Sequence, residues 1–83
     1  MANPIHDPHY QVFRNLLVNA RTSKGVMQVE LAEKLGKNQS YVSKFERGER
    51  RLDFTEFVDI AFALDLDIAD FIKKYVSGIT NFT

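Results

Sequence analysis

The chain contains no cysteine and no tryptophan among its 83 residues. The absence of cysteine excludes a disulfide framework and a Cys-ligated metal site, and it fits a reducing compartment such as the cytoplasm. The longest apolar runs are only a few residues, too short to span a bilayer. The polar start, Met1 to Pro4, lacks the basic end and the apolar core of a signal peptide. We therefore expect a cytoplasmic protein that has no membrane partner.

The chain also lacks a net charge, because 11 Lys and Arg oppose 11 Asp and Glu. The charges are nevertheless unevenly spread along the sequence. Residues 37–51 carry five basic and two acidic side chains, whereas residues 52–83 carry two basic and six acidic ones. The field at a surface depends on local charge, so the middle segment can present a basic surface despite the neutral total. A set of solvated faces with no binding role explains the same distribution equally well.

Patterns typical of enzymes and metal sites are missing as well. No nucleophile is paired with a plausible base, no carboxylate pair shares an expected face, and no glycine-rich loop could hold a phosphate. His6 and His9 flank Asp7, but two histidines without a third convergent ligand rarely bind a metal. We expect no enzyme activity, no metal, no cofactor and no small-molecule ligand.

The sequence does carry start and stop signals for short helices. Asp7 is an N-cap candidate, and the proline after it suits the first helical position. Gly25, Gly36 and Gly48 follow apolar-periodic segments, where glycine permits the left-handed conformation that ends a helix. Asp53 opens a D-x-x-E capping box for a fourth helix, and a similar acidic pattern precedes a fifth.

Apolar side chains recur at three- and four-residue spacing through these segments, and no strand-like alternation competes with them. The pattern predicts one compact all-α domain of five helices. The expected boundaries are a flexible segment over residues 1–6, the domain over residues 7–76 and a tail over residues 77–83. The residues expected in the core are Phe13, Leu17, Leu31, Leu35, Val42, Phe45, Phe57, Ala61 and Leu64, with Phe54 on the same stripe of the fourth helix.

Further apolar residues are candidates for a dimer patch, although a place in the core fits them equally well. Two of them lie on other faces of the expected fourth helix, and the rest belong to the last 13 residues of the chain. They are Ile60, Phe62, Phe71, Tyr75, Ile79 and Phe82.

Residues 28–48 are the most informative segment. They form two short amphipathic helices joined by a tight turn at Gly36, and the second helix begins with Gln39 and Ser40. An amide such as that of Gln39 matches the major-groove edge of adenine, and an amine such as that of Lys44 can donate to guanine. This pattern predicts a helix-turn-helix whose second helix enters the major groove of DNA.

The chain resembles the helix-turn-helix domain of the Cro/C1 repressor family, also called XRE-type regulators. The resemblance covers about residues 10 to 75. The matching residues are Ala20-Arg21, Gly25, Gln28-x-Glu30-Leu31-Ala32, Leu35-Gly36, Gln39-Ser40-Tyr41-Val42-Ser43-Lys44, Glu46-x-Gly48-Glu49-Arg50 and Ile60-Ala61-x-Ala63-Leu64. The resemblance implies a lambda-repressor-like bundle of five helices that binds an operator as a dimer.

The resemblance also implies roles for individual residues. Base readers would be Gln39, Ser40 and Lys44, although all three, like Ser43, could be merely solvated surface residues. Gln28 would contact a phosphate, and Asn38 and Ser43 would contact phosphates or cap the helix. Arg47, Arg50 and Arg51 would lie near the DNA backbone. Arg21 and Glu46 would form a structural ion pair.

Two departures from the family pattern concern helix ends. Met27 stands where the family prefers Ser or Thr, and a thioether cannot cap a helix, which forgoes about 1 kcal/mol. Asp65 stands where Gly is common, so the fourth helix is expected to end less cleanly. We expect a sequence-specific regulator of transcription that binds double-stranded DNA as a homodimer on a palindromic site. The alternative is a protein-interaction module of antitoxin or anti-repressor type with little DNA binding.

Overall fold

The structure, a computed structural model, describes residues 7–80. The expected flexible segment 1–6, His6 and Phe82 therefore lie outside the described residues. Five helices and no strand are present over residues 7–80, as the sequence predicted, and none of these helices is long and apolar enough to cross a membrane. The helices are α1 (Pro8–Ser23), α2 (Gln28–Leu35), α3 (Gln39–Glu46), α4 (Phe54–Ala63) and α5 (Ile68–Thr80).

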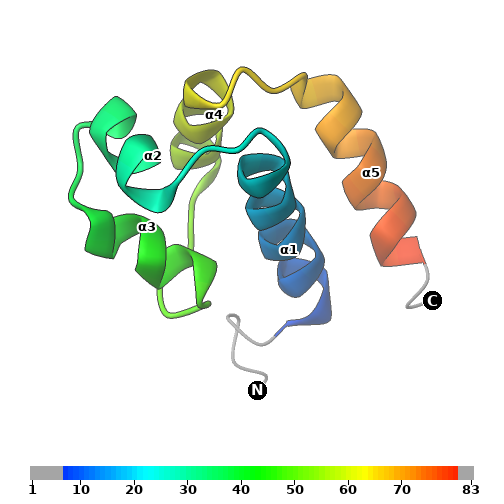
Figure 1. Cartoon of the computed structure of the whole chain (residues 1–83). Helices are drawn as coiled ribbons and strands as arrows, with labels where there is room; N and C mark the ends of the chain where they lie inside the picture. The colour runs from blue at the N-terminus through cyan, green and yellow to red at the C-terminus, as the bar shows by residue number, and fades with distance from the viewer. Residues whose placement is uncertain (1–6, 81–83) are drawn as a thin grey trace.

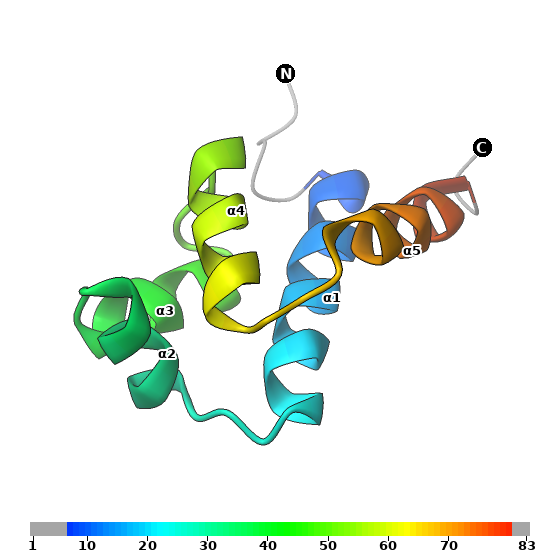
Figure 2. The same cartoon turned by 90° about the horizontal axis from the view of Figure 1, so that it is seen from above.

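The helices pack in two pairs with α4 between them. Figure 1 shows α1 and α5 side by side, while α2 and α3 lie together on the other side of the molecule. Figure 2 shows the same arrangement from above. Contacts of α1 with α3 and of α2 with α4 join the two pairs around one core. The pair α2 and α3, with its turn, is the predicted helix-turn-helix.

The helices begin where capping groups satisfy their free N–H groups. The Asp7 carboxylate accepts a hydrogen bond from the backbone N–H of His9 at 2.8 Å. Asp53 and Glu56 form the predicted capping box, each side chain accepting from the other's backbone N–H. Met27 caps nothing with its own side chain, as expected, but its backbone N–H donates to the Glu30 carboxylate at 2.9 Å. Half of a capping box therefore remains at the start of α2.

The core decides between the two alternatives left open for Ile60 and Phe71, and it corrects the expectation for Phe54. Ile60 and Phe71 are buried among the other core side chains, so they do not belong to a surface patch. Phe54 is 68% exposed, because it is the first residue of α4 and precedes the buried stripe of that helix. The core also contains Tyr10, which the sequence analysis missed, and its hydroxyl accepts a hydrogen bond from the buried N–H of Leu52 at 2.9 Å.

Gly36 makes the tight turn between α2 and α3. Its φ of 68° lies in the left-handed region, which costs glycine no steric clash. Its N–H donates to the Glu33 carbonyl, and the next N–H, of Lys37, donates back to the Ala32 carbonyl at 2.9 Å. These bonds satisfy the last carbonyls of α2 and direct the chain into α3.

The helix α5 continues four residues beyond the expected domain boundary. Residues 77–80, which were expected to belong to a tail, are helical. Gly78 lies in this last part of α5, and a Cβ atom at its position would lie 2.7 Å from Cγ1 of Val12 in α1. The two helices therefore approach each other closely where glycine has no side chain, and Ile79 beside it is half-buried.

The helix α4 ends cleanly despite having Asp65 where the family often has glycine. Asp65 adopts a φ of 55°, in the left-handed region. The N–H groups of Asp65 and Leu66 donate to the Phe62 and Ala61 carbonyls at 3.1 and 2.9 Å. Aspartate tolerates this conformation better than most residues, but it still has a Cβ atom.

We expect Asp65→Gly to be about 1 kcal/mol more stable than Asp65→Ala, because only glycine adopts a positive φ without steric cost. Both variants remove the carboxylate, and both keep the backbone carbonyl that accepts from Lys24 Nζ. Urea unfolding followed by circular dichroism measures the difference. Equal stability of the two variants would show that the left-handed conformation carries no cost at this position.

Candidate nucleic-acid interface

The helix α3 has one buried side and one exposed side. Val42 and Phe45 are buried in the core. Gln39, Ser40 and Lys44 are exposed on the opposite side of the helix, where Gln39 and Ser40 are adjacent and Lys44 follows Ser40 by four residues. The three predicted base readers are therefore displayed together at the surface. Their contact with a base stays a prediction.

Arg21 and Glu46 form a buried, bidentate ion pair between α1 and α3. Arg21 Nε donates to Glu46 Oε2 at 2.6 Å, and Nη2 donates to Oε1 at 2.9 Å. The third nitrogen, Nη1, donates to the Val26 carbonyl at 2.7 Å. The side chains are 11% and 7% exposed. The structure therefore contains the ion pair that the resemblance implied.

Gln28 connects this ion pair to the exposed surface of α3. Its Nε2 donates to Glu46 Oε1 at 2.9 Å, and its Oε1 accepts from Gln39 Nε2 at 3.3 Å. The sequence placed Gln28 at a helix N-terminus as a phosphate contact and did not reveal this link. A continuous set of hydrogen bonds thus runs from Arg21 to Gln39.

The other polar residues at the start of α3 act as a cap. Asn38 Oδ1 accepts from the backbone N–H of Tyr41 at 3.2 Å and from the Ser40 hydroxyl at 2.6 Å. Of the two roles expected for Asn38, it plays that of the cap in the free protein. The Ser40 hydroxyl is exposed and bonded to the cap, so base contact would require this proton to be redirected.

At the other end of α3, Arg47 forms a fork with Glu49. Arg47 Nε and Nη2 donate to the two Glu49 carboxylate oxygens at 2.8 and 3.1 Å, and Nη1 donates to the Ser43 hydroxyl. The Glu49 carboxylate raises the pKa of Arg47 above its ordinary value, and Arg47 lowers the pKa of Glu49. Both residues stay charged, and their half-exposed side chains remain open to solvent.

Arg50, which follows α3 in the sequence, contacts both α3 and α4. Its Nη2 donates to the Glu56 carboxylate at 2.7 Å, and its guanidinium carbon lies 4.8 Å from the centre of the Tyr41 ring. The Tyr41 hydroxyl donates to the same carboxylate at 3.2 Å. Burial and Glu56 raise the pKa of Tyr41, whereas the hydrogen bond from Arg50 and then the Asp53 N–H lower the pKa of Glu56. Arg50 is therefore a structural residue in the free protein.

Arg51 lies apart from the polar side of α3. Its guanidinium carbon is 4.5 Å from the centre of the Tyr10 ring in α1, at the edge of a pocket. Arg47, Arg50 and Arg51 are close in the sequence, but each contacts a different partner: Glu49, Glu56 and the Tyr10 ring, respectively.

Arg14 is a contact that the sequence analysis missed. Its Nη1 donates to the backbone carbonyl of Glu46 at 2.6 Å, which satisfies an orphan carbonyl at the C-terminal end of α3. Arg14 precedes Arg21 by seven residues, two helical turns, so both lie on one side of α1. The seven-residue spacing between Arg14 and Arg21 was the sequence signal that could have predicted this contact.

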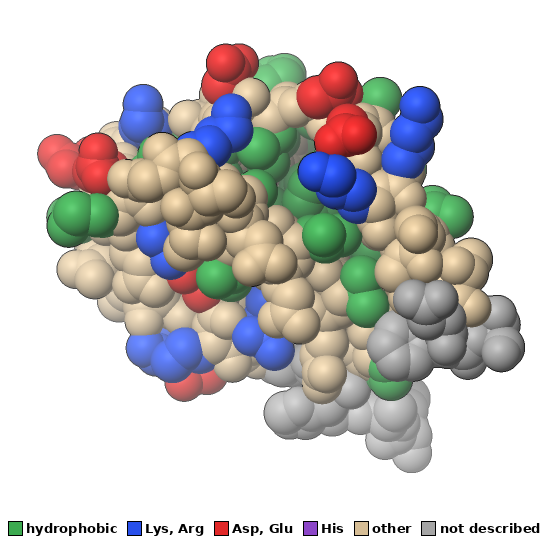
Figure 3. Space-filling model, turned by 45° about the vertical axis from the view of Figure 1, so that its right-hand side comes forward, with side chains coloured by type: hydrophobic (Ala, Val, Ile, Leu, Met, Phe, Trp, Pro, Cys, Tyr) green, Lys and Arg blue, Asp and Glu red, His purple; other side chains and the backbone are tan. Residues whose placement is uncertain are grey.

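Basic side chains do not gather into a single patch on the face that Figure 3 shows. Figure 3 shows blue side chains at the top and right as well as at the lower left, with red ones between them. The basic residues of the central segment are partly neutralised, since Arg47 pairs with Glu49 and Arg50 with Glu56. Glu56 belongs to the acidic segment 52–83, whereas Arg50 belongs to the basic segment 37–51. Counting charges segment by segment therefore hides this ion pair.

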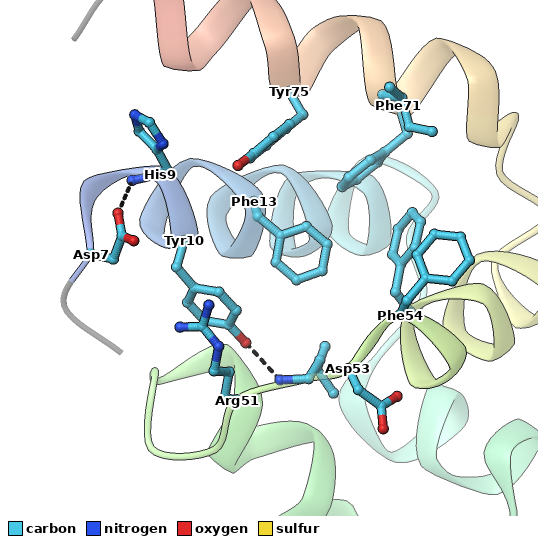
Figure 4. Close-up of a pocket in the computed structure, with 12 residues that line it drawn as sticks. Asp7, His9, Tyr10, Phe13, Arg51, Asp53, Phe54, Phe71 and Tyr75 are labelled. Atoms are coloured by element: carbon cyan, nitrogen blue, oxygen red, sulfur yellow. Dashed lines mark hydrogen bonds between the residues drawn. The ribbon is translucent and has the colours of Figure 1, made fainter. Parts of the chain in front are cut away.

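A pocket of about 360 Å³ lies between α1, α5 and the start of α4. Figure 4 shows Tyr10, Phe13, Phe71 and Tyr75 directed into this space, with Arg51 beside Tyr10 at its edge. The exposed Phe54 and Ile72 also line it. The pocket is aromatic and is formed by residues other than the α3 surface.

These features together define a helix-turn-helix domain, and comparison with known proteins places it in a family. The helix-turn-helix family profile matches residues 17–71, more than half of the chain. The chain belongs to the Cro/C1-type, or XRE, helix-turn-helix family. It is 39% identical over 62 residues to an uncharacterized HTH-type transcriptional regulator, y4dL, of Sinorhizobium fredii (strain NBRC 101917 / NGR234). The match covers 75% of this chain but 32% of that relative, so the chain spans about a third of its length.

Solved structures agree with this placement. An XRE-family like protein from Pseudomonas syringae pv. tomato str. DC3000 is 42% identical, with a TM-score of 0.81 over 88% of this chain and 89% of that one. The restriction-modification controller C.AhdI from Aeromonas hydrophila is 34% identical, with a TM-score of 0.67 over 80% and 99%. The controller C.Esp1396I, solved as a tetramer with its natural 35 base-pair operator, shares the fold at 24% identity and a TM-score of 0.78 over 87% and 95%.

The lowered pKa of Glu56 predicts a pH dependence of stability. A carboxylate whose pKa is lower in the folded state stabilises the fold above its ordinary pKa, about 4.3, and this stability is lost as the pH falls through the folded value. Glu56→Gln should lower the free energy of unfolding by about 1 kcal/mol at neutral pH and flatten its decline in acid.

Urea unfolding at a series of pH values measures this effect. Glu33→Gln is the matched control, because Glu33 is an exposed glutamate of α2 outside this cluster. If Glu56→Gln and Glu33→Gln gave parallel curves, the hydrogen bonds to Glu56 would not govern the acid response.

Proposed function

We propose that this chain is a sequence-specific, double-stranded DNA-binding domain of a transcriptional regulator, and that it acts as a homodimer on a two-fold symmetric operator. The observation that supports this most directly is the polar, exposed side of α3, whose opposite side is anchored in the core. A helix held in this way can enter the major groove, about 12 Å wide, without rearrangement of the fold. This role requires no catalysis, and we propose none for the chain.

In this proposal three side chains of α3 read bases. The Gln39 amide would pair with adenine, Lys44 would donate to guanine, and Ser40 would bond to either once released from Asn38. Lysine discriminates less sharply than arginine because it acts as a point charge. The exposed position of all three side chains supports this assignment.

Phosphate contacts would set the position of the domain on the duplex without reading sequence. Gln28 is suited to contact a phosphate because it begins α2, where free N–H groups and the helix dipole favour an anion. Ser43 and Arg47 are bonded to each other near the end of α3, so they would approach the same phosphate. Arg50 would contribute from its position against Glu56, whereas Arg51 would need to leave Tyr10.

The dimer would form through the aromatic pocket and α5. Phe54, Ile72 and Val76 are large apolar side chains that are 68%, 46% and 48% exposed. Phe54 and Ile72 line the pocket, and Val76 follows Ile72 by one turn on the same side of α5. A two-fold axis through this surface would let the protruding side chains of each protomer cover the pocket of the other. Two recognition helices would then face successive major grooves, about 34 Å apart.

Selection of bound sequences from a random duplex pool tests the proposal. At low salt we expect enrichment of two half-sites separated by about one helical turn. Lys44→Ala should relax the preference at one base position of each half-site by about five-fold, near the lower limit for a specific pair. Arg47→Ala is the control, and it should weaken all sequences alike and lower the salt slope by about one.

Failure to enrich any sequence at low salt would overturn the DNA-binding function and favour the protein-interaction module. An unchanged preference profile in Lys44→Ala would remove that residue from the set of base readers while leaving the function intact.

For the dimer, we expect Ile72→Glu to raise the dissociation constant by ten-fold or more. Burial of an isoleucine is worth about 1.5–3 kcal/mol, and a charge in a desolvated interface costs more. Phe62→Glu is the matched control, because Phe62 is 72% exposed on α4 and outside the lining of the aromatic pocket. Sedimentation equilibrium measures both variants. A dimer that survives Ile72→Glu but is lost in Phe62→Glu would place the interface elsewhere.

A further inference from the structure

The Glu46 carboxylate does more than neutralise Arg21. It is a residue of α3, and it accepts hydrogen bonds from α1 through Arg21 and from α2 through Gln28. Oε2 accepts a hydrogen bond from Arg21 Nε at 2.6 Å, and Oε1 accepts one from Arg21 Nη2 and one from Gln28 Nε2, each at 2.9 Å. Glu46 is only 8% exposed, so water competes little for these positions.

This arrangement determines which way the Gln28 amide points. An amide has a donor side and an acceptor side, which can exchange by rotation of the terminal group. An ionised carboxylate only accepts, so Gln28 must turn its NH₂ group toward Glu46. Its carbonyl oxygen then points away from the ion pair and toward Gln39, 3.3 Å from the Gln39 nitrogen.

The orientation of the Gln39 amide follows in the same way. The Gln28 oxygen accepts, so Gln39 must direct one N–H toward it. The second N–H and the carbonyl oxygen of Gln39 are then left for other partners. One donor and one acceptor, side by side, are what the major-groove edge of adenine requires. Reversal of the Gln39 amide would exchange the donor and the acceptor presented to the base.

We propose that Glu46, held by Arg21, is a positioning residue for base readout and sets the orientation of the Gln39 amide through Gln28. This inference rests on the proposed function, because it assigns Arg21 and Glu46 a part in specificity as well as in the scaffold. Arg21 and Gln28 both donate to Glu46, and Gln39 donates to Gln28, so each of the two amides turns its donor side toward the buried carboxylate.

Two variants interrupt the chain at different points. Glu46→Gln keeps the shape but replaces an acceptor with an amide, so the orientation of Gln28 is no longer imposed. Gln28→Leu removes the intermediate amide and leaves the ion pair intact. The first test is nuclear magnetic resonance of the side-chain amides of the free protein. Both variants should shift the Gln39 side-chain resonance and speed exchange of its protons with water, and an unchanged resonance would overturn the proposal.

The second test is the preference profile from a random duplex pool. The base position read by Gln39 is located with Gln39→Ala. At that position Glu46→Gln and Gln28→Leu should each reduce the preference for the favoured base by about five-fold or more. A reduction of about five-fold is the lower limit for loss of a bidentate amide contact. Ile60→Val is the control, because it shortens a core side chain of α4 and should leave the profile unchanged while lowering stability.

The outcomes separate the two proposals. A wild-type protein that selects no sequence overturns the proposed function and, with it, the role in readout. A wild-type protein that selects a sequence, with variants that keep its profile, overturns the positioning role alone. If Glu46→Gln fails to fold because Arg21 loses its partner, Gln28→Leu decides by both measurements.

Discussion

One buried carboxylate determines how the recognition helix sits in this fold. Glu46 in α3 binds Arg21 of α1 and Gln28 of α2, and its backbone carbonyl binds Arg14 of α1. Apolar packing through Val42 and Phe45 tolerates small rotations of α3, because dispersion contacts have no direction. The bidentate ion pair does not tolerate them, and loss of one buried partner costs about 3–5 kcal/mol, much of the 5–15 kcal/mol that stabilises a typical domain.

A second brace holds the other side of α3. Tyr41 and Arg50 both bond to Glu56, which also caps α4, so the recognition helix is tied to α4 at the point where α4 begins. An interface that is ordered before binding has less conformational entropy to lose. Two ion pairs explain why counting charges along the chain overestimates the basic surface. Arg47 and Arg50 were assigned to DNA from the sequence, and in the free protein each one holds a carboxylate.

Local signals made much of the fold predictable. The caps at Asp7, Asn38 and Asp53 and the turn at Gly36 act within a few residues, so they can be read without tertiary structure. Burial at the edge of a helix stripe depends on neighbouring helices instead. For this reason Ile60 proved to be core, Phe54 proved to be exposed, and residues 77–80 extended α5. The family resemblance predicted the ion pair of Arg21 and Glu46. The hydrogen bonds of Gln28 and Arg50 could not be predicted, because they depend on how neighbouring helices are placed relative to one another.

Gly78 connects the packing of α1 and α5 to the geometry of DNA recognition. Because a Cβ atom there would lie 2.7 Å from Cγ1 of Val12, a larger residue requires either the Val12 side chain or α5 to move. In the proposed dimer α5 carries the contact surface, so its tilt determines the distance between the two recognition helices. The spacing of operator half-sites would then depend on the contact between α1 and α5, whereas the base-reading residues lie in α3. A single methyl group at this position could change which spacing is bound while the base preference of each half-site stays the same.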